Sequence, residues 1–210
     1  NAEKYEQDAK QLNELDHYQA LIVPGGFGSR GIEGKIAVIQ YARTHKIPFL
    51  GLCYGMQLMA VEFARNVLRW PEAHTTEVKP KTPKPVIDLM PEQARLLKEH
   101  HLGGSMRLGV YRCRIMPNTK VAKAYGQRAV DERHRHRYEF QNQYQEAFAK
   151  QGMRVAGVEP SRKLVEILEL ENHPWFIGTQ FHPELTSRPL RPHPLFVGLL
   201  KTGLRQTKKS

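Results

Sequence analysis

The sequence predicts an α/β fold with a central, mostly parallel sheet and helices on its faces. Two strand–loop–helix units follow one another, because apolar runs at 18–23 and 47–52 each lead through glycines into a segment with helical spacing. The 210 residues are enough for one such domain with a sizeable core. Loops at the carboxyl ends of parallel strands lie along one edge of a sheet. We therefore expect the two glycine-rich turns to lie together.

Composition narrows the class of protein. A net charge of +11 suits an anionic partner such as a nucleotide, nucleic acid or an acidic protein face. No RNA-binding aromatic signature or helix-turn-helix pattern accompanies this charge. No apolar run approaches membrane-spanning length, and residues 1–16 are too polar for a signal peptide. The two cysteines, Cys53 and Cys113, form no C-x-x-C pair, so we expect a reducing, cytoplasmic setting without a disulfide or metal site.

The first strand leads into a loop that is rich in glycine. Residues 1–17 form a polar, helical lead-in, and the strand at 18–23 follows. Four of the eight residues at 24–31 are glycine, which indicates a backbone that approaches another group closely. A helix at 32–44 follows with apolar residues at helical spacing.

The glycine loop has two functional interpretations. Backbone N–H groups at Gly25 and Gly26 can stabilise a developing negative oxygen, as in an oxyanion hole. A phosphate-binding loop is the alternative, but the pattern G-x-x-x-x-G-K-[ST] is missing.

A single cysteine stands at the apex of the second turn. Gly51-Leu52-Cys53-Tyr54-Gly55 lies between the strand at 47–52 and a helix at 58–68. This G-x-C-x-G pattern is the thiol version of the nucleophile elbow. The helix start directs N–H groups and a positive dipole end toward the sulfur, which favours a thiolate. A buried, inert cysteine is the alternative for this motif alone.

The middle of the chain carries fewer signals. Five prolines between 70 and 91 predict an irregular loop around 86–90. A turn is expected at 102–107, and the alternation at 108–115 predicts an antiparallel strand in which Cys113 packs.

A basic run, Arg133-His-Arg-His-Arg-Tyr-Glu139, lies within 130–144. In a strand it would place arginines on one face and His134 and His136 on the other. A solvated basic edge, a contact for an anion or substrate carboxylate, and a nucleic-acid contact are all compatible with it. The two histidines lack a third ligand for a metal site.

The last third of the chain supplies a base and an acid. Strands are expected at 153–159 and 165–170, and a further strand from Trp175 ends in His182-Pro-Glu184. Residues two apart share one side of an extended chain, so Glu184 can orient the His182 imidazole.

Together with Cys53, these two residues form a candidate thiolate–base–carboxylate triad. A capping or core role is the alternative for His182. A helix-like segment at 192–200 closes the domain, and a disordered basic tail is expected at 201–210.

Three motifs together resemble the class I glutamine amidotransferases: Pro24–Gly28, Gly51–Gln57 and Gln180–Glu184. Over roughly residues 18–200 the chain is similar, more closely, to the glutaminase domains of the CTP synthase family, in the segments Gly25–Lys35, Met59–Asn66, Gly104–Gly109, Arg133–Glu139 and Ser187–Pro189. The resemblance implies a flavodoxin-like α/β fold. It also implies that the first strand and helix of the domain precede Asn1.

The resemblance implies hydrolysis of L-glutamine. Cys53 would attack the side-chain amide, His182 would act as base and then acid, and Glu184 would hold the imidazole. The N–H groups of Gly26 and Tyr54 would form the oxyanion hole, although the family usually has leucine where this chain has Tyr54. The implied glutamine-binding residues are Gly25, Gly26, Tyr54, Gln57, Glu77 and Arg137.

The resemblance also implies a larger enzyme. Ammonia would pass to an N-terminal synthetase domain, absent from this chain, that aminates UTP to CTP with ATP and Mg and is activated by GTP. The glutaminase reaction itself needs no cofactor, and the full enzyme is expected to be a homo-tetramer with no membrane or nucleic-acid partner. The alternatives are the glutaminase domain of GMP synthetase or carbamoyl-phosphate synthetase, which would lack the basic run, and a non-catalytic nucleotide- or nucleic-acid-binding module.

Overall fold

The computed structural model describes residues 1–89 and 106–207. The strands within this part are β1 (Leu21–Val23), β2 (Phe49–Leu52), β3 (Ala73–Thr75), β4 (Lys84–Leu89), β5 (Arg107–Ile115), β6 (Ala129–His136), β7 (Tyr138–Phe140), β8 (Met153–Val158), β9 (Val165–Leu170) and β10 (Phe176–Thr179). The helices are α1 (Glu3–Gln7), α2 (Ile32–Thr44), α3 (Tyr54–Asn66), α5 (Lys120–Tyr125), α6 (Gln145–Lys150) and α7 (Pro194–Thr207), with 3-10 helices η1 (Ala9–His17), η2 (Asn142–Tyr144) and η3 (Pro183–Leu185).

The described residues form a central seven-stranded sheet with the order β1-β2-β10-β9-β8-β5-β6. The α/β class is confirmed, but the sheet is mixed and not mostly parallel. Only the pairs β1–β2 and β2–β10 are parallel, and the other four pairs are antiparallel. The two opening strand–helix units account for the parallel part. The later strands are joined by short connections without a crossover helix, and such connections produce antiparallel neighbours.

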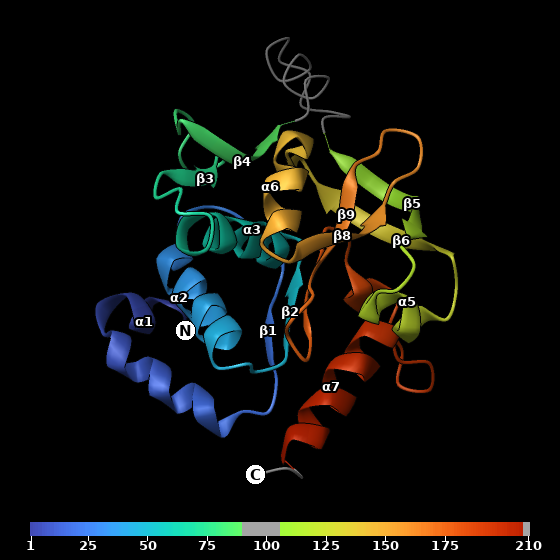
Figure 1. The fold of residues 1–210 in the computed structure, drawn as a ribbon, viewed down its shortest axis with the longest axis horizontal. Helices are drawn as coiled ribbons and strands as arrows, with labels where there is room; N and C mark the ends of the chain where they lie inside the picture. The colour runs from blue at the N-terminus through green and yellow to red at the C-terminus, as the bar shows by residue number, and fades with distance from the viewer. Residues whose placement is uncertain (90–105, 208–210) are drawn as a thin grey trace.

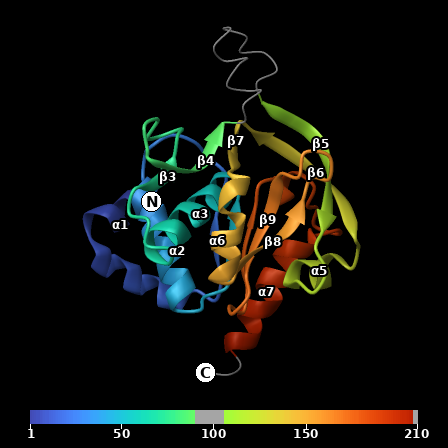
Figure 2. The same ribbon diagram turned by 45° about the horizontal axis from the view of Figure 1, so that its top comes forward.

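The alternation of side chains along β2 and β10 separates two apolar layers. Phe49 and Phe176 pack in a cluster with residues of α2, α3 and α6. Leu50 and Ile177, one position on, pack in a second cluster with residues of α5 and α7. Accordingly, α1 to α3 lie to one side of the central strands and α5 and α7 to the other (Figures 1 and 2). The central strands are therefore covered on both faces.

A second, three-stranded sheet has the order β3-β4-β7 (Figure 2). The prediction of an irregular loop at 70–91 is wrong here, because β3 and β4 pair with each other in spite of the prolines. The basic run at 133–139, considered above as a strand, is divided between the two sheets, since β6 pairs with β5 and β7 pairs with β4. Arg137 lies at the corner between them. The expected alternation is confirmed along β6, where His134 and His136 are buried and the arginines are exposed.

Both ends of the described chain pack against the domain. The lead-in is helical as predicted, and the Glu6 carboxylate accepts hydrogen bonds from the backbone N–H groups of Glu33 (2.9 Å) and Gly34 (3.1 Å). The prediction of a disordered tail is wrong as far as residue 207, because α7 continues to Thr207. The predicted turn at 102–107 lies largely outside the described residues. Helices α5 and α6 were not predicted. Within the described residues, no helix is long and apolar enough to cross a membrane.

The packing of α7 gives a testable prediction. A Cβ on Gly198 would lie 2.0 Å from Cη2 of Trp175, whose side chain is 5% exposed. Overpacking of this kind costs about 1–3 kcal/mol, whereas alanine gains about 1 kcal/mol over glycine in a helix. We expect Gly198→Ala to lower the free energy of unfolding in urea by a net amount of about 1 kcal/mol. Leu204→Ala on the same helix is the control, because Leu204 is 65% exposed. Equal effects of the two substitutions would contradict the prediction.

Candidate active site

Cys53 lies at the junction of β2 and α3 in a strained backbone conformation. Its φ of 49° is unusual for a residue with a side chain. The turn needs glycine on both sides, since a Cβ on Gly51 would lie 2.7 Å from the Gly55 carbonyl oxygen, and a Cβ on Gly55 would lie 2.1 Å from that of Val23. The backbone N–H of Cys53 donates to the carbonyl of Thr179 (2.6 Å). This bond joins the turn to the strand that leads to His182.

His182 is held by its backbone and by its ring. Its N–H donates to the Arg133 carbonyl (2.8 Å), and its Nδ1 donates to Oε1 of Glu184 (2.6 Å). The interaction with the Cys53 side chain, followed by that with Glu184, raises the pKa of His182 to about 10. Burial alone would raise the pKa of Glu184, but the hydrogen bond from His182 helps to lower it overall. The imidazole is therefore charged at neutral pH.

Gly25 shows how closely Cys53 and His182 approach the glycine loop. A Cβ at this position would lie 2.9 Å from Cε1 of His182 and 3.8 Å from Cβ of Cys53. The remaining ring nitrogen of His182, Nε2, is buried and has no close hydrogen-bond partner among the described residues. The fold thus brings together Cys53, His182, Glu184 and Gly25 from opposite ends of the chain.

The glycine loop is fixed by two side chains. The Tyr54 hydroxyl donates to the Gly28 carbonyl (2.5 Å), and the Gly28 N–H donates to the Glu77 carboxylate (2.9 Å). Tyr54 is the first residue of α3, so its N–H has no carbonyl partner within that helix. A Cβ on Gly26 would lie 3.6 Å from the Tyr54 ring. The two predicted oxyanion donors are therefore neighbours, and Glu77 supports the loop beside them.

The other two predicted glutamine contacts, Gln57 and Arg137, lie near Tyr138. Gln57 is 2% exposed, and its Nε2 donates to the Tyr138 carbonyl (3.0 Å). Its Oε1 and the Nε of Arg137 are buried without hydrogen-bond partners among the described residues. Glu77 and Arg137 both influence the pKa of the Tyr138 hydroxyl, which burial raises. Both residues therefore lie close to Tyr138.

Sequence reasoning missed several neighbours of Cys53. Gln180 donates from Nε2 to the Cys53 sulfur (3.7 Å) and accepts from Gln57 (3.3 Å). The Arg135 carbonyl is 4.0 Å from the same sulfur. Gln180 could have been found, because it lies two residues before His182 on the same side of an extended chain. The backbone contact of Arg135 has no signal in the sequence.

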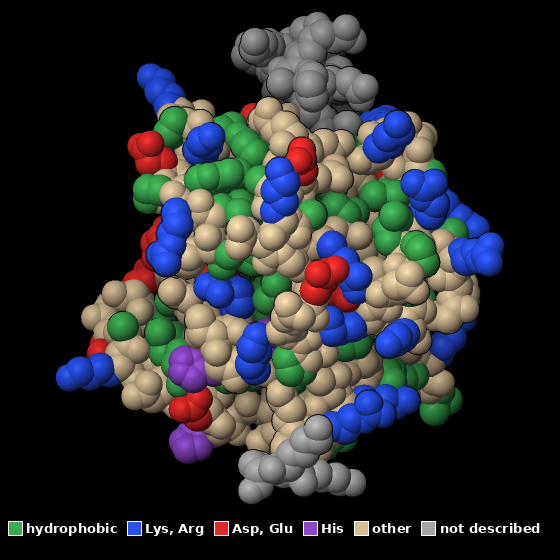
Figure 3. All heavy atoms as spheres, viewed as in Figure 1, with side chains coloured by type: hydrophobic (Ala, Val, Ile, Leu, Met, Phe, Trp, Pro, Cys, Tyr) green, Lys and Arg blue, Asp and Glu red, His purple; other side chains and the backbone are tan. Residues whose placement is uncertain are grey.

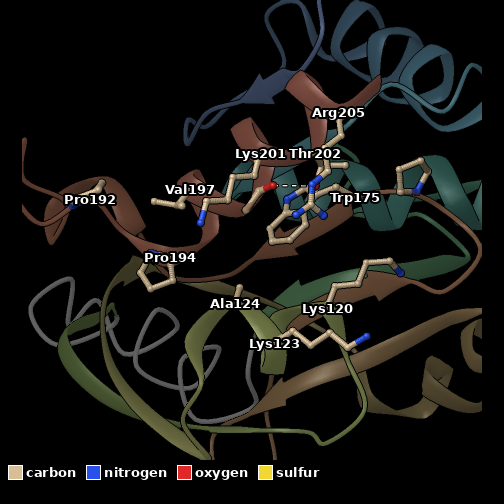
Figure 4. Close-up of a pocket in the computed structure, with 12 residues that line it drawn as sticks. Lys120, Lys123, Ala124, Trp175, Pro192, Pro194, Val197, Lys201, Thr202 and Arg205 are labelled. Atoms are coloured by element: carbon tan, nitrogen blue, oxygen red, sulfur yellow. Dashed lines mark hydrogen bonds between the residues drawn. The ribbon is translucent and has the colours of Figure 1, made fainter. Parts of the chain in front are cut away.

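A cavity on the surface of the described residues lies away from this arrangement. A cavity of about 540 Å³ lies between α5 and α7, lined by Lys120, Lys123, Trp175 and Lys201 among others, and contains none of the predicted site residues (Figure 4). On the face in Figure 3, Lys and Arg side chains are dispersed and do not form one patch. No group of His, Cys, Asp and Glu in the described ranges could hold a metal ion.

The sequence and the fold of this chain match those of known proteins. The family profile described as "Glutamine amidotransferase class-I" matches residues 1–202. The chain belongs to the class I glutamine amidotransferase family. The glutaminase domain of Trypanosoma brucei CTP synthase, solved with bound acivicin, matches this amidotransferase domain with a TM-score of 0.91 and 32% identity over 98% of this chain and 79% of that one. A GMP synthase subunit from Thermoplasma acidophilum shares only the fold, with 17% identity and a TM-score of 0.61.

Sequence relatives place the amidotransferase domain within the CTP synthases. The CTP synthase of Prochlorococcus marinus strain MIT 9312 is 51% identical over 100% of this chain and 38% of that protein. The CTP synthase of Carboxydothermus hydrogenoformans is 53% identical over 95% of this chain and 36% of that protein. The chain therefore corresponds to the glutaminase domain of a CTP synthase and spans a little over a third of the length of these relatives.

The raised pKa of His182, which interacts with Cys53 and Glu184, gives a second prediction. We expect the His182 ring to titrate with a pKa of about 10, as followed by NMR of its ring protons. Because the pKa of His182 is raised on folding, its interactions with Cys53 and Glu184 stabilise the folded domain. This contribution is fully present below the ordinary histidine pKa of 6.5 and is lost as the pH rises through about 10.

Two variants separate the causes of this shift. Cys53→Ala should lower the pKa of His182 more than Glu184→Gln does, since the interaction with Cys53 is the larger cause. A wild-type ring that titrates near its ordinary value would contradict the prediction.

Proposed function

We propose that this domain hydrolyses the side-chain amide of L-glutamine through Cys53, His182 and Glu184. The observation that carries the proposal is the meeting of a strained, enclosed thiol with a carboxylate-bound imidazole, both of them close to Gly25 of the glycine loop. A protonated His182 next to the sulfur favours the thiolate form, which is the nucleophile in such pairs.

The reaction proceeds in two balanced steps. The Cys53 sulfur attacks the amide carbon, and the oxyanion is stabilised by the N–H groups of Gly26 and Tyr54. The C–N bond then breaks, the amine takes the His182 proton and leaves as ammonia, and a γ-glutamyl thioester remains. A water molecule gives a proton to His182 and attacks the thioester, which releases glutamate and the thiolate.

The residues around Cys53 are suited to hold the amino-acid end of glutamine. The Arg137 guanidinium, whose Nε is buried, and the Glu77 carboxylate have charges opposite to those of an α-carboxylate and an α-ammonium group. Gln57 has an unused buried Oε1 that can accept a hydrogen bond from the substrate. We assign glutamine binding to Gly25, Gly26, Tyr54, Gln57, Glu77 and Arg137.

The relatives named CTP synthase suggest the fate of the ammonia. We propose that it passes to a synthetase domain outside this chain, which aminates UTP to CTP with ATP and Mg, is activated by GTP and assembles as a homo-tetramer. The glutaminase step itself uses only side chains and backbone of this domain and needs no cofactor. Neither a membrane nor nucleic acid takes part.

Labelling with the glutamine-mimicking electrophile diazo-oxo-norleucine, followed by mass spectrometry, tests the proposal. We expect a single adduct on Cys53 that excess glutamine suppresses, because the electrophile uses the substrate pocket. The adduct should be absent in Cys53→Ala and His182→Ala and unchanged in Cys113→Ala, since burial raises the pKa of Cys113 well above its ordinary value.

Two outcomes would overturn the proposal. An absence of labelling would show that Cys53 is not activated, and equal labelling of both cysteines would show that no pocket selects it. The non-catalytic nucleotide-binding interpretation would then be preferred. Binding that weakens steeply with salt would support that interpretation.

A further inference from the structure

A buried cluster of charged side chains lies behind the candidate nucleophile. The Arg107 guanidinium, 3% exposed, donates to Oε1 of Glu139 (3.0 Å) and to Oε1 of Glu166 (2.9 Å). Both carboxyl groups are almost fully buried, and His134 and His136 lie beside them. Two carboxylates opposite one guanidinium would leave an uncompensated buried charge, which is strongly unfavourable. Burial raises the pKa of Glu139 to about 8 and that of Glu166 to about 7, so either carboxyl group can hold a proton, and the hydrogen-bond geometry has to decide between them.

Hydrogen-bond directions indicate which carboxyl group holds the proton. The Tyr138 carbonyl can only accept, so Nδ1 of His136, which is 3.2 Å away, carries a hydrogen. Burial lowers the pKa of His136 far below its ordinary value, and the ring is therefore neutral. Its Nε2 is then bare and must accept from Nδ1 of His134, which is 2.8 Å away.

The same reasoning continues to Glu166. Burial lowers the pKa of His134 to about 3, so this ring is neutral too, and its Nε2 is bare. That Nε2 lies 3.4 Å from Oε2 of Glu166. Both atoms are buried and neither has a hydrogen-bond partner among the described residues. Two bare acceptors would repel each other at this distance, whereas a proton on Oε2 joins them.

We propose that Glu166 is a buried carboxylic acid that starts a one-way chain of hydrogen bonds through His134 and His136 to the Tyr138 carbonyl. Glu139 is then the carboxylate that balances Arg107. In this arrangement Glu166 is a positioning residue for the glutaminase site. The effect on activity rests on the proposed function, but the protonation of Glu166 does not.

Both ends of this chain contact glutamines beside the nucleophile. The Glu166 backbone carbonyl accepts from the N–H of Gln180 (2.8 Å), whose side chain reaches the Cys53 sulfur. The Tyr138 carbonyl also accepts from Nε2 of Gln57 (3.0 Å). The chain of bonds thus runs between two residues whose backbone carbonyls hold these glutamines.

A hydrogen-bond chain of the opposite direction, from a protonated Glu139 through His136 and His134 to Glu166, fits the geometry less well. With the proton on Glu139, the two rings would carry hydrogen on Nε2, and His136 would present a bare Nδ1 to the Tyr138 carbonyl. Oε1 of Glu139, 3.4 Å from that Nδ1, already accepts from Arg107. Two acceptors would then face each other at 3.2 Å.

The surroundings determine how the acid responds to pH. Arg107 favours ionisation of Glu166, and the nearby Glu159 carboxylate opposes it. Because the pKa of Glu166 is raised, the acid form and the chain of bonds persist at low pH and are lost as the pH rises through that pKa. The further titratable or charged groups around the cluster are Tyr111, Cys113, Glu139, Arg162 and His182.

Glu166→Gln and Glu139→Gln are a matched pair of variants that test the assignment. A glutamine at 166 can donate from its amide to His134 and accept from Arg107, as the protonated acid does. We expect the rate of Cys53 labelling to stay within about threefold of wild type in Glu166→Gln. Glu139→Gln removes the charge opposite Arg107 and should lower that rate about tenfold or more. The ratio of the Glu166→Gln rate to the wild-type rate should grow as the pH rises.

Nitrogen-15 NMR of the histidine rings provides a readout independent of activity. We expect both His134 and His136 to carry hydrogen on Nδ1 in the wild type and in Glu166→Gln, with assignment from His134→Gln. Hydrogen on Nε2 of His134, or tolerance of Glu139→Gln together with loss in Glu166→Gln, would overturn the inference. If wild-type Cys53 is not labelled at all, the proposed function fails, and the ring tautomers still decide the protonation of Glu166.

Discussion

The positive φ of Cys53 is the constraint on which the candidate site depends. A side chain in this conformation costs about 1–3 kcal/mol, which the surrounding packing has to offset. The offset comes from the glycines on either side of the turn, which let α3 approach β1, and from the bond to the Thr179 carbonyl. In return, the sulfur is directed out of the sheet toward His182. Cys113 illustrates the contrast, because it lies within a regular strand, where burial disfavours its thiolate.

The parallel and antiparallel halves of the mixed sheet contribute different parts of the candidate site. The parallel half supplies the turn with Cys53 and the glycine loop, each at the carboxyl end of a strand. The antiparallel half supplies support from backbone groups, since β6 presents the carbonyls of Arg133 and Arg135 to His182 and Cys53. Strands β5, β6, β7 and β9 together supply the buried charged cluster. The histidines of the basic run therefore act inside the protein, although the charge of the run first directs attention to its surface.

Local sequence patterns predicted the parts of the site in which residues close in sequence act together. The turn around Cys53, the pair His182 and Glu184, and the alternation along β6 all follow from spacing over a few residues. The direction of the later strands was mispredicted, because it depends on connections and not on composition. The pairing of β3 with β4 was missed, since prolines dominate the local signal. The Arg107 cluster unites β5, β6, β7 and β9, and no single stretch of sequence contains it.

Strand β10 lies between β2 and β9, yet it is made long after β2. Cys53 and His182 are 129 positions apart (182 − 53), and at ribosomal speeds of about 5–20 residues per second His182 follows Cys53 by roughly 6–26 seconds. During that interval a nascent chain contains the thiol without its imidazole and without the Thr179 carbonyl that anchors the turn. The bond between Cys53 and the Thr179 carbonyl, and the approach of His182, can therefore form only after β10, the strand that precedes His182, has been inserted. The order of synthesis thus leaves Cys53 without these neighbours until the sheet is complete.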